Sequence, residues 1–257
     1  MKIVTWNVNS VGARKERLLR WLATKQPDVV CLQELKCLDE AFPRAEVEAL
    51  GYQAAVLGQR TYNGVAILAK TPISEVKRGL EDDDSDPEAR FLSAQVAGLR
   101  IFSCYIPNGQ EQTSPKFEYK QRWLDRLLAY LARHHQPGEP LLVCGDFNIA
   151  PEDRDVYDPE ALREDVLCHF KVRERWSALL SWGLVDTYRL HVADAGKFSW
   201  WDYRMLGFPK GRGLRIDHVL ATRSLAERCT SASIDRDERK GKQPSDHAPV
   251  IAELRWP

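Results

Sequence analysis

The chain has 257 residues, 44% of them hydrophobic, and Lys plus Arg balances Asp plus Glu at 37 each, so its formal net charge is zero. This length can bury one large core, and the charge balance gives no global signal for a nucleic-acid partner, so a surface for nucleic acid must be local. No stretch reaches the roughly 20 apolar residues of a membrane span, and the N-terminus lacks the apolar segment and cleavage site of a signal peptide.

The six cysteines show no CxxC pairing, and their spacing does not indicate structural zinc. Cys31, Cys104 and Cys144 lie inside apolar runs, where a free thiol behaves as a small hydrophobic side chain. Unpaired cysteines in apolar runs predict a reducing compartment, which we take to be the cytoplasm.

The first half of the chain predicts strands and helices that end in polar residues. In order, the expected elements are a strand over 2–8, an amphipathic helix over 14–24, a buried strand over 28–34, a short helix over 42–50 and strands over 52–57 and 64–70. Asn7 and Asn9 lie two apart at the end of the first strand, and Glu34 ends the second buried strand. A turn before a helix would explain the asparagines, but Glu is a poor strand residue and at an element's end indicates function.

The second half begins with an acidic run over 81–88, expected to be a solvated loop. It continues with a hairpin over 90–96 and 99–105, a long helix that opens at Ser114-Pro115, a buried strand over 141–144, a weak helix over 159–165, a helix over 172–182 and strands over 214–221 and 250–255. Several strands are joined by hairpin-length loops, which favours packed mixed sheets with helices outside. No repeat, linker or composition break divides the chain, so we expect one domain over 1–257.

The most informative stretch is LLVCGDFN at 141–148. Gly145 permits a close backbone approach after the apolar run, and Asp146 and Asn148 lie two apart, so an extended backbone points both side chains the same way. The ends of strands are where α/β folds place their chemistry. The alternative interpretation is a strand exit in which Asp and Asn serve as turn formers.

Carboxylates and carboxamides dominate the polar strand ends. The set is Asn7, Asn9, Glu34, Tyr105, Asn108, Asp146, Asn148, Asp217, Asp246 and His247. Such oxygen ligands suit Mg²⁺ or Mn²⁺, and no His/Cys set is present to hold zinc. A magnesium site of this kind can polarise a phosphoryl oxygen and supply an activated water.

His247 follows Asp246, and Asp217 on another strand can orient its imidazole as a general-base dyad requires. His218 points to the opposite face of the strand from Asp217 and is expected to be structural. The remaining histidines are not part of such an Asp–His pair and are expected to be surface or core residues: His134, His135, His169 and His191.

Six motifs appear in one order along the whole chain: WNVNS, LQEL, YxPNG, GDFNIAP, GLRID and SDHAPV. Together they resemble the exonuclease III family of the endonuclease/exonuclease/phosphatase superfamily, of the bacterial type. The resemblance implies a four-layered α/β sandwich, with two packed mixed β-sheets flanked by helices. It also implies a metal-dependent phosphodiesterase acting on double-stranded DNA, with abasic-site incision, 3′→5′ exonuclease activity and removal of 3′ blocking groups. We also expect the protein to be a monomer.

The resemblance also assigns roles in the site. It makes Glu34 the principal metal ligand, assisted directly or through water by Asn7, Asn9 and Asp246, with Asp146 and Asn148 as further possible ligands. Asp146 aligns or deprotonates the attacking water, which Asn148 orients. His247, paired with Asp217, binds the scissile phosphate, and Tyr105 and Asn108 also contact it.

Substrate contacts are implied on both sides of this set. Trp200, Leu214 and Ile216 match positions that wall a pocket for a flipped-out abasic sugar, although core packing would also explain them. Candidates for contacts with the DNA backbone are Tyr62, Arg90, Arg204, Lys210, Arg212, Lys240 and Lys242.

Two features depart from the family pattern. Glu111 stands where some relatives carry a basic residue that grips DNA. Bulky Leu167 or His169 near the pocket rim is expected to obstruct an abasic site and favour activity at the 3′ end.

Two other functions fit parts of the pattern. One is a superfamily phosphodiesterase or phosphatase acting on lipid or inositol phosphates. The FSWWDYR and GLRID segments favour DNA as the substrate over these phosphates. The other is a catalytically inactive RNA-binding regulator of the same fold, which the presence of the full polar set disfavours.

Overall fold

Two six-stranded sheets form the centre of this computed structural model, which describes residues 1–82 and 86–256. The first sheet runs in the order β13 (Cys229–Ile234), β14 (Val250–Leu254), β1 (Lys2–Asn7), β2 (Val29–Gln33), β4 (Val65–Ala69) and β3 (Gln53–Leu57). The second runs β5 (Ile73–Arg78), β6 (Phe91–Val96), β7 (Leu99–Tyr105), β8 (Leu141–Asp146), β12 (Asp217–Thr222) and β9 (Leu184–Asp186). The acidic loop expected over 81–88 lies partly outside the described residues.

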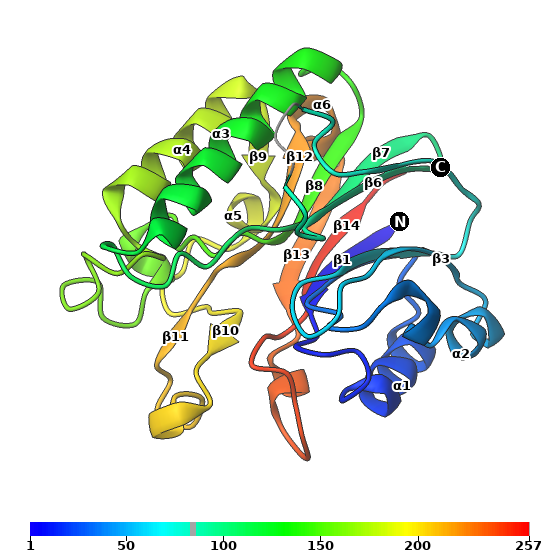
Figure 1. Ribbon diagram of the computed structural model, residues 1–257, viewed down its shortest axis with the longest axis horizontal. Coiled ribbons are helices and arrows are strands. Elements are labelled where there is room, and N and C mark those ends of the chain that lie inside the picture. Colours follow the sequence, from blue (N-terminus) through cyan, green and yellow to red (C-terminus); the bar gives the residue numbers. More distant parts are fainter. Residues whose placement is uncertain (83–85, 257) are drawn as a thin grey trace.

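Helices cover the outer faces of both sheets, as Figure 1 shows. Residues of α1 (Lys15–Lys25) and α2 (Arg44–Ala49) pack on the first sheet, and α3 (Pro115–His134) and α4 (Phe170–Trp182) pack on the second. The short helices are α5 (Thr187–His191) and α6 (Arg223–Ala226). The four-layered α/β sandwich expected from the resemblance is therefore confirmed. No helix in the described ranges combines the length and apolarity that crossing a membrane would require.

Alternation along the strands explains why both faces of each sheet are apolar. In β2, Val29 and Cys31 face the second sheet in the central core, whereas Val30 and Leu32 face α1. Because successive strand side chains point to opposite faces, a strand covered on both sides must be apolar throughout. The three cysteines expected in apolar runs are buried free thiols: Cys31 and Cys144 lie in this central core, and Cys104 lies in the core beneath α3 and α4.

The strand directions bring the polar ends to one edge. β1 and β2 are parallel, and so are β7 and β8. The ends of these four strands therefore meet at this edge, with Asn7, Tyr105 and Asp146 as last strand residues and Glu34 directly after β2. β12 is antiparallel to β8, with its first residue Asp217 opposite Asp146. Gly145 is required for this approach, since a Cβ there would lie 2.0 Å from the carbonyl oxygen of Cys104.

Local signals set several element boundaries. Ser114 caps α3, its hydroxyl accepting a hydrogen bond from the Lys116 amide at 3.2 Å, and Pro115 is the first helical residue. The hairpin between β6 and β7 turns at Ala97 and Gly98, both with positive φ (48° and 78°), as a tight two-residue turn requires.

The structure corrects two expected elements. Residues 159–165 form turns and not a helix, because their charged side chains bury no continuous apolar face. The strand expected over 214–221 is broken: β11 (Gly213–Leu214) pairs with β10 (Trp200–Trp201) in a separate ribbon, and β12 begins only at Asp217.

Several elements have no counterpart in the sequence prediction, among them the strands β5, β9, β10 and β13 and the short helices α5 and α6. β5 and β13 lie at sheet edges and carry many exposed polar residues. Their sequences therefore lack the apolar alternation that identifies a half-buried strand.

Candidate active site

Glu34 receives three side-chain hydrogen bonds at the end of β2. The Asn7 amide and the Tyr105 hydroxyl each donate to Oε1 at 2.8 Å, and the Lys36 ammonium lies 2.8 Å from Oε2. Glu34 and Lys36 both have positive φ (52° and 55°), so the backbone leaves the strand in a left-handed conformation. This turn carries the carboxylate inward from the sheet edge.

Asp146 is buried at the end of β8 and organises the loop that follows. Its Oδ2 accepts a hydrogen bond from the Asn7 side chain at 2.9 Å, and its Oδ1 accepts one from the backbone N–H of Asn148, also at 2.9 Å. Asn148 has φ 51°, and its side chain lies 3.2 Å from that of Asn108. The local geometry thus joins the polar ends of β1, β7 and β8.

Asp217 fixes the imidazole of His247. Its carboxylate lies 2.9 and 3.1 Å from Nδ1 of His247 and accepts a hydrogen bond from the Ser199 hydroxyl at 2.6 Å. Nε2 of His247 faces Asp146 at 3.7 Å. The expected dyad is therefore present in the geometry, and a third residue, Ser199, orients its acid.

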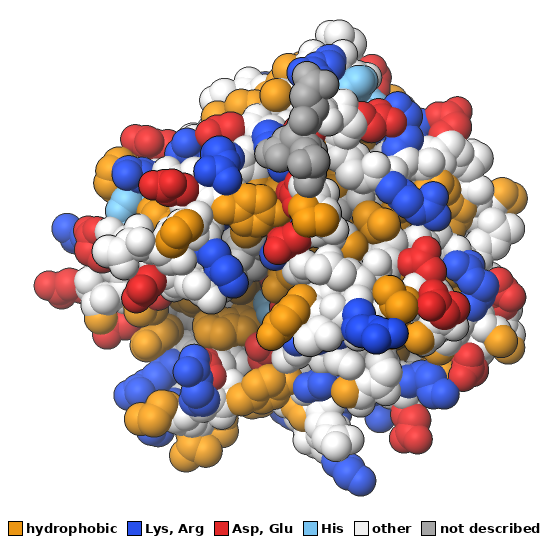
Figure 2. Space-filling model, in the orientation of Figure 1, with side chains coloured by type: hydrophobic (Ala, Val, Ile, Leu, Met, Phe, Trp, Pro, Cys, Tyr) orange, Lys and Arg blue, Asp and Glu red, His pale blue; other side chains and the backbone are white. Residues whose placement is uncertain are grey.

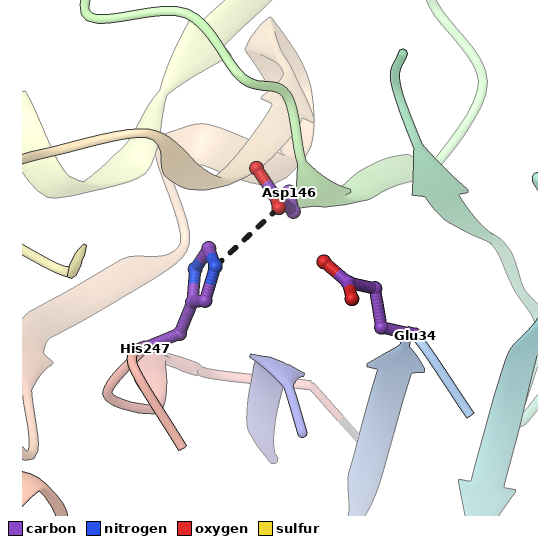
Figure 3. Close-up of side chains that lie close together, drawn as sticks. All are labelled: Glu34, Asp146 and His247. Atoms are coloured by element: carbon purple, nitrogen blue, oxygen red, sulfur yellow. Dashed lines mark ion pairs between the residues drawn. The ribbon is translucent and has the colours of Figure 1, made fainter. Parts of the chain in front are cut away.

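Glu34, Asp146 and His247 point toward one another from β2, from β8 and from the segment before β14 (Figure 3). One ligand atom from each lies within 4.8 Å of the others. Since Nδ1 of His247 is engaged by Asp217, the atoms that could ligate a cation here are mainly the carboxylate oxygens of Glu34 and Asp146. Carboxylate oxygens suit a hard divalent cation such as Mg²⁺.

Burial and charge shift the protonation of these groups. Burial raises the pKa of Asp146, and the His247 charge offsets this only in part. Burial alone would lower the pKa of His247, but the Asp217 and Asp146 carboxylates raise it well above the ordinary value. Burial and the Glu34 carboxylate raise the pKa of Tyr105, which is therefore a neutral donor. The site holds a charged imidazolium beside a carboxylate with an increased proton affinity.

Asp246 and Asn9 form a second polar group beside this centre. Asn9 donates to Oδ1 of Asp246 at 2.8 Å, and the indole of Trp200 donates to Oδ2 at 3.0 Å. Lys36 donates to the side-chain oxygen of Asn9 at 2.6 Å and so links this group to Glu34.

A mostly apolar pocket of about 600 Å³ lies beside Trp200. Leu167, Trp200 and Leu214 are among its lining residues. Ile216 is not, because it is 1% exposed and packs in the core beneath α3 and α4. His169 is not either: it caps α4, its Nδ1 accepting a hydrogen bond from the Lys171 amide.

A cleft of about 650 Å³, with both polar and apolar lining, includes Tyr105 in its wall, together with Tyr62, Arg90 and Asn108 among others. Arg90 is largely buried there, with its guanidinium 4.7 Å from the centre of the Tyr105 ring, and it pairs with Glu88. It therefore holds Tyr105 in place and is not a free contact for phosphate.

Sequence reasoning missed Lys36, Ser199 and Lys120. Lys36 could have been found from its spacing, two residues after Glu34. Lys120 lies on the apolar stripe of α3, between Phe117 and Leu124, where a charge is unusual. The other histidines are peripheral: His134 and His191 are exposed, and His135 lies beside Glu139.

Known proteins resemble this chain along its full length. A curated exodeoxyribonuclease III from Haemophilus influenzae is 38% identical over 99% of this chain and 100% of its own length. Among solved structures, the 3′ phosphatase NExo from Neisseria, bound to a product DNA hairpin, has a TM-score of 0.96 and 39% identity with full coverage of both chains. An AP endonuclease from Archaeoglobus fulgidus has a TM-score of 0.96 and 36% identity, covering 99% of each chain.

The family model for the endonuclease/exonuclease/phosphatase family matches residues 4–247, which include every polar strand end described above. With the sandwich fold and the convergent carboxylates and imidazole, this match leads to one conclusion: the chain belongs to the endonuclease/exonuclease/phosphatase family.

Proposed function

We propose that this protein is a metal-dependent phosphodiesterase that cleaves double-stranded DNA during repair, at abasic sites or at 3′ ends. The observation that carries the proposal is the convergence of Glu34, Asp146 and His247 within 4.8 Å. Their chemistry supplies a cation ligand, a base and a positive charge in one place, which are the groups that phosphodiester hydrolysis needs.

Mg²⁺ is the cofactor that we propose, with Mn²⁺ as the alternative. Glu34 and Asn7 would hold it, with Asp246 and Asn9 acting through water. Held there, the ion would supply the positive charge that polarises a phosphoryl oxygen. Lys36 already places a positive charge against Glu34 and lowers the pKa of that carboxyl despite its burial, so Glu34 is ionised and ready for a cation near neutral pH.

We assign Asp146 as the base that takes a proton from the attacking water. Burial raises its pKa toward neutrality, which is the range in which a general base works best. Asn148 orients the water, and the raised pKa of His247 keeps its imidazolium charged, so that Nε2 neutralises the phosphate. Tyr105 and Asn108 contribute further donors to the phosphate oxygens.

The loop between β10 and β11 is the DNA-contacting surface that we propose beside the pocket. Met205 and Leu206 at its tip are 75% and 63% exposed. Basic side chains flank them, namely Arg204, Lys210 and Arg212, and Figure 2 shows this mixture of blue and orange at the lower left. Apolar wedges with flanking cations are typical of proteins that open a duplex from the minor groove. Arg204 pairs with Asp202 and would have to exchange that partner for a phosphate.

The remaining expectations are part of the same proposal. Both sheets contribute to one site, so we treat residues 1–257 as one domain. We propose a monomer that works in a reducing compartment such as the cytoplasm, in keeping with the free thiols of all six cysteines, which lie in the described ranges.

Labelled duplexes test the proposed activity. One substrate carries an internal abasic analogue and the other a recessed 3′ end, and each is incubated with Mg²⁺ and with chelator. We expect Mg²⁺-dependent incision or shortening that weakens as salt rises. Hydrolysis of an inositol polyphosphate, with both duplexes intact, would assign the protein to another branch of the superfamily.

Replacing Leu167 by Gly is expected to favour abasic-site incision over 3′-end trimming. Leu167 is 6% exposed and lines the apolar pocket, so removal of its side chain enlarges the space for an extruded sugar. The measurement is the ratio of the two initial rates on the labelled duplexes. Leu162→Ala, which trims the same pocket elsewhere, serves as the comparison. An unchanged ratio in Leu167→Gly would remove this explanation.

A further inference from the structure

The segment after Asp146 is held by buried side chains that no step of the reaction uses. Asn148 adopts a left-handed conformation, φ 51°, and its side chain donates to the Ile106 carbonyl at 2.9 Å. A non-glycine residue keeps such a conformation only when its surroundings fix it. Two of these surroundings are Lys120 on α3 and His218 on β12.

Lys120 is completely buried, and its ammonium donates to three backbone carbonyls. The acceptors are Asn148 at 2.6 Å, Val166 at 2.8 Å and Asn108 at 3.1 Å. A lysine has three N–H donors, so each has a partner. The three carbonyls belong to three separate segments: the one after Asp146, the pocket wall before Leu167 and the loop after β7.

The loop after β7 also packs on the stem of Lys120. A Cβ at Gly109, where φ is 98°, would lie 3.2 Å from Cδ of Lys120. The loop that carries Asn108 therefore sits directly against this side chain, and the position tolerates only glycine without a shift.

His218 reaches the same segment from the opposite side. Its Nε2 lies 2.9 Å from the Ile149 carbonyl, and its Nδ1 lies 2.9 Å from the Arg215 guanidinium. A guanidinium only donates, so Nδ1 accepts and Nε2 carries the hydrogen that is donated to Ile149. Arg215 is itself fixed by ion pairs with Asp155 and Asp186.

The ring of His218 has little freedom to move. It is completely buried, with the ring of Trp176 at 4.4 Å and that of Phe147 at 5.5 Å between centroids. The carbonyls of Asn148 and Ile149 are thus held by two buried donors from different elements of the fold.

We propose that Lys120 and His218 are positioning residues that clamp the backbone of residues 148–149 and thereby fix Asp146 and Asn148 for catalysis. The inference rests on the proposed function, in which Asp146 acts as the base and Asn148 orients the attacking water. Neither Lys120 nor His218 needs to touch the substrate. Displacing a reacting group by about 1 Å can lower a rate by about 100-fold, so a clamp at this point acts mainly on kcat.

Four variants test the clamp: Lys120→Met, His218→Leu, His218→Gln and Leu131→Ala. The first two remove the donors, whereas Gln retains an N–H for Ile149 and an oxygen for Arg215. Leu131 is buried on α3 outside these contacts, so its variant controls for loss of stability alone. Turnover of the duplex substrate is measured well below the unfolding temperature, and hydrogen exchange is followed over residues 147–150.

In Lys120→Met and His218→Leu, we expect kcat to fall by about 10- to 100-fold with little change in KM and exchange over 147–150 to accelerate. His218→Gln should recover most of the activity, and Leu131→Ala should change neither quantity. Lys120→Met added to Asn148→Ala should cause little further loss, because both act through the same residue.

The proposal is overturned if exchange over 147–150 is unchanged in both clamp variants, or if their kcat falls no more than that of Leu131→Ala while Asp146→Asn still lowers turnover strongly. Faster exchange, with turnover unaffected both by these variants and by Asp146→Asn, would instead refute the proposed role of Asp146 while leaving the clamp of the backbone in place.

Discussion

Replacement of Asp146 by Asn is expected to lower kcat on duplex DNA by about 1,000-fold, within the range that removal of a general base produces. The amide has nearly the same shape, and its single oxygen can still accept one of the two hydrogen bonds that Asp146 receives from the Asn7 side chain and from the Asn148 backbone. It cannot take a proton from water. Steady-state rates with excess Mg²⁺ measure the effect, and the thermal unfolding midpoint shows whether the fold is retained.

The matched control is Asp28→Asn, at the opposite end of β2, where the carboxylate accepts a hydrogen bond from the Lys2 backbone amide at 2.6 Å. Asp28→Asn should turn over at the rate of the unmodified protein. Activity that survives in Asp146→Asn, at more than about a tenth of the original rate, would show that another group fills the general-base role.

Replacement of Glu34 by Ala is expected to raise the Mg²⁺ concentration needed for half-maximal activity by at least about tenfold, because loss of even a residue that orients a metal ligand typically weakens a metal site by about 10- to 100-fold, and Glu34 is itself a proposed ligand. The change also leaves the Lys36 ammonium without its carboxylate. A residual positive charge then repels the cation and weakens binding further. A calorimetric titration with Mg²⁺ in the absence of DNA measures metal binding separately from turnover.

Glu46→Ala serves as the comparison, since Glu46 forms only an exposed ion pair with Lys15 on the outer helices. Its Mg²⁺ dependence should match that of the unmodified protein. If Glu34→Ala binds Mg²⁺ as tightly as the unmodified protein, the principal ligand lies elsewhere in the site, and Asp146 becomes the first alternative.

Much of the active-site set follows from local sequence features. Asn7, Glu34, Tyr105 and Asp146 each end a run of apolar residues, and buried strands are identified by such runs. The direction of parallel strands then places their ends at one edge. The bounds of α3 were also predictable, because Ser114 and Pro115 open it and Pro137-Gly138 follows it.

Other features depend on contacts between segments that are far apart in the sequence. The edge strands β5 and β13 owe their conformation to pairing with β6 and β14, since their own residues carry no clear period. Ile216 is another case: the family resemblance placed it with Leu214 on one pocket wall, but the break between β11 and β12 sends Ile216 into the core.

The chemical groups at the strand ends can be identified from the amino-acid order alone, because apolar runs and the polar residues after them are local properties of the chain. How those groups are held depends on the folded arrangement of the chain. The three carbonyls bound by Lys120 and the imidazole orientation set by Asp217 are pairings between distant segments. A buried donor takes the acceptors that packing brings to it, and packing is a property of the whole fold.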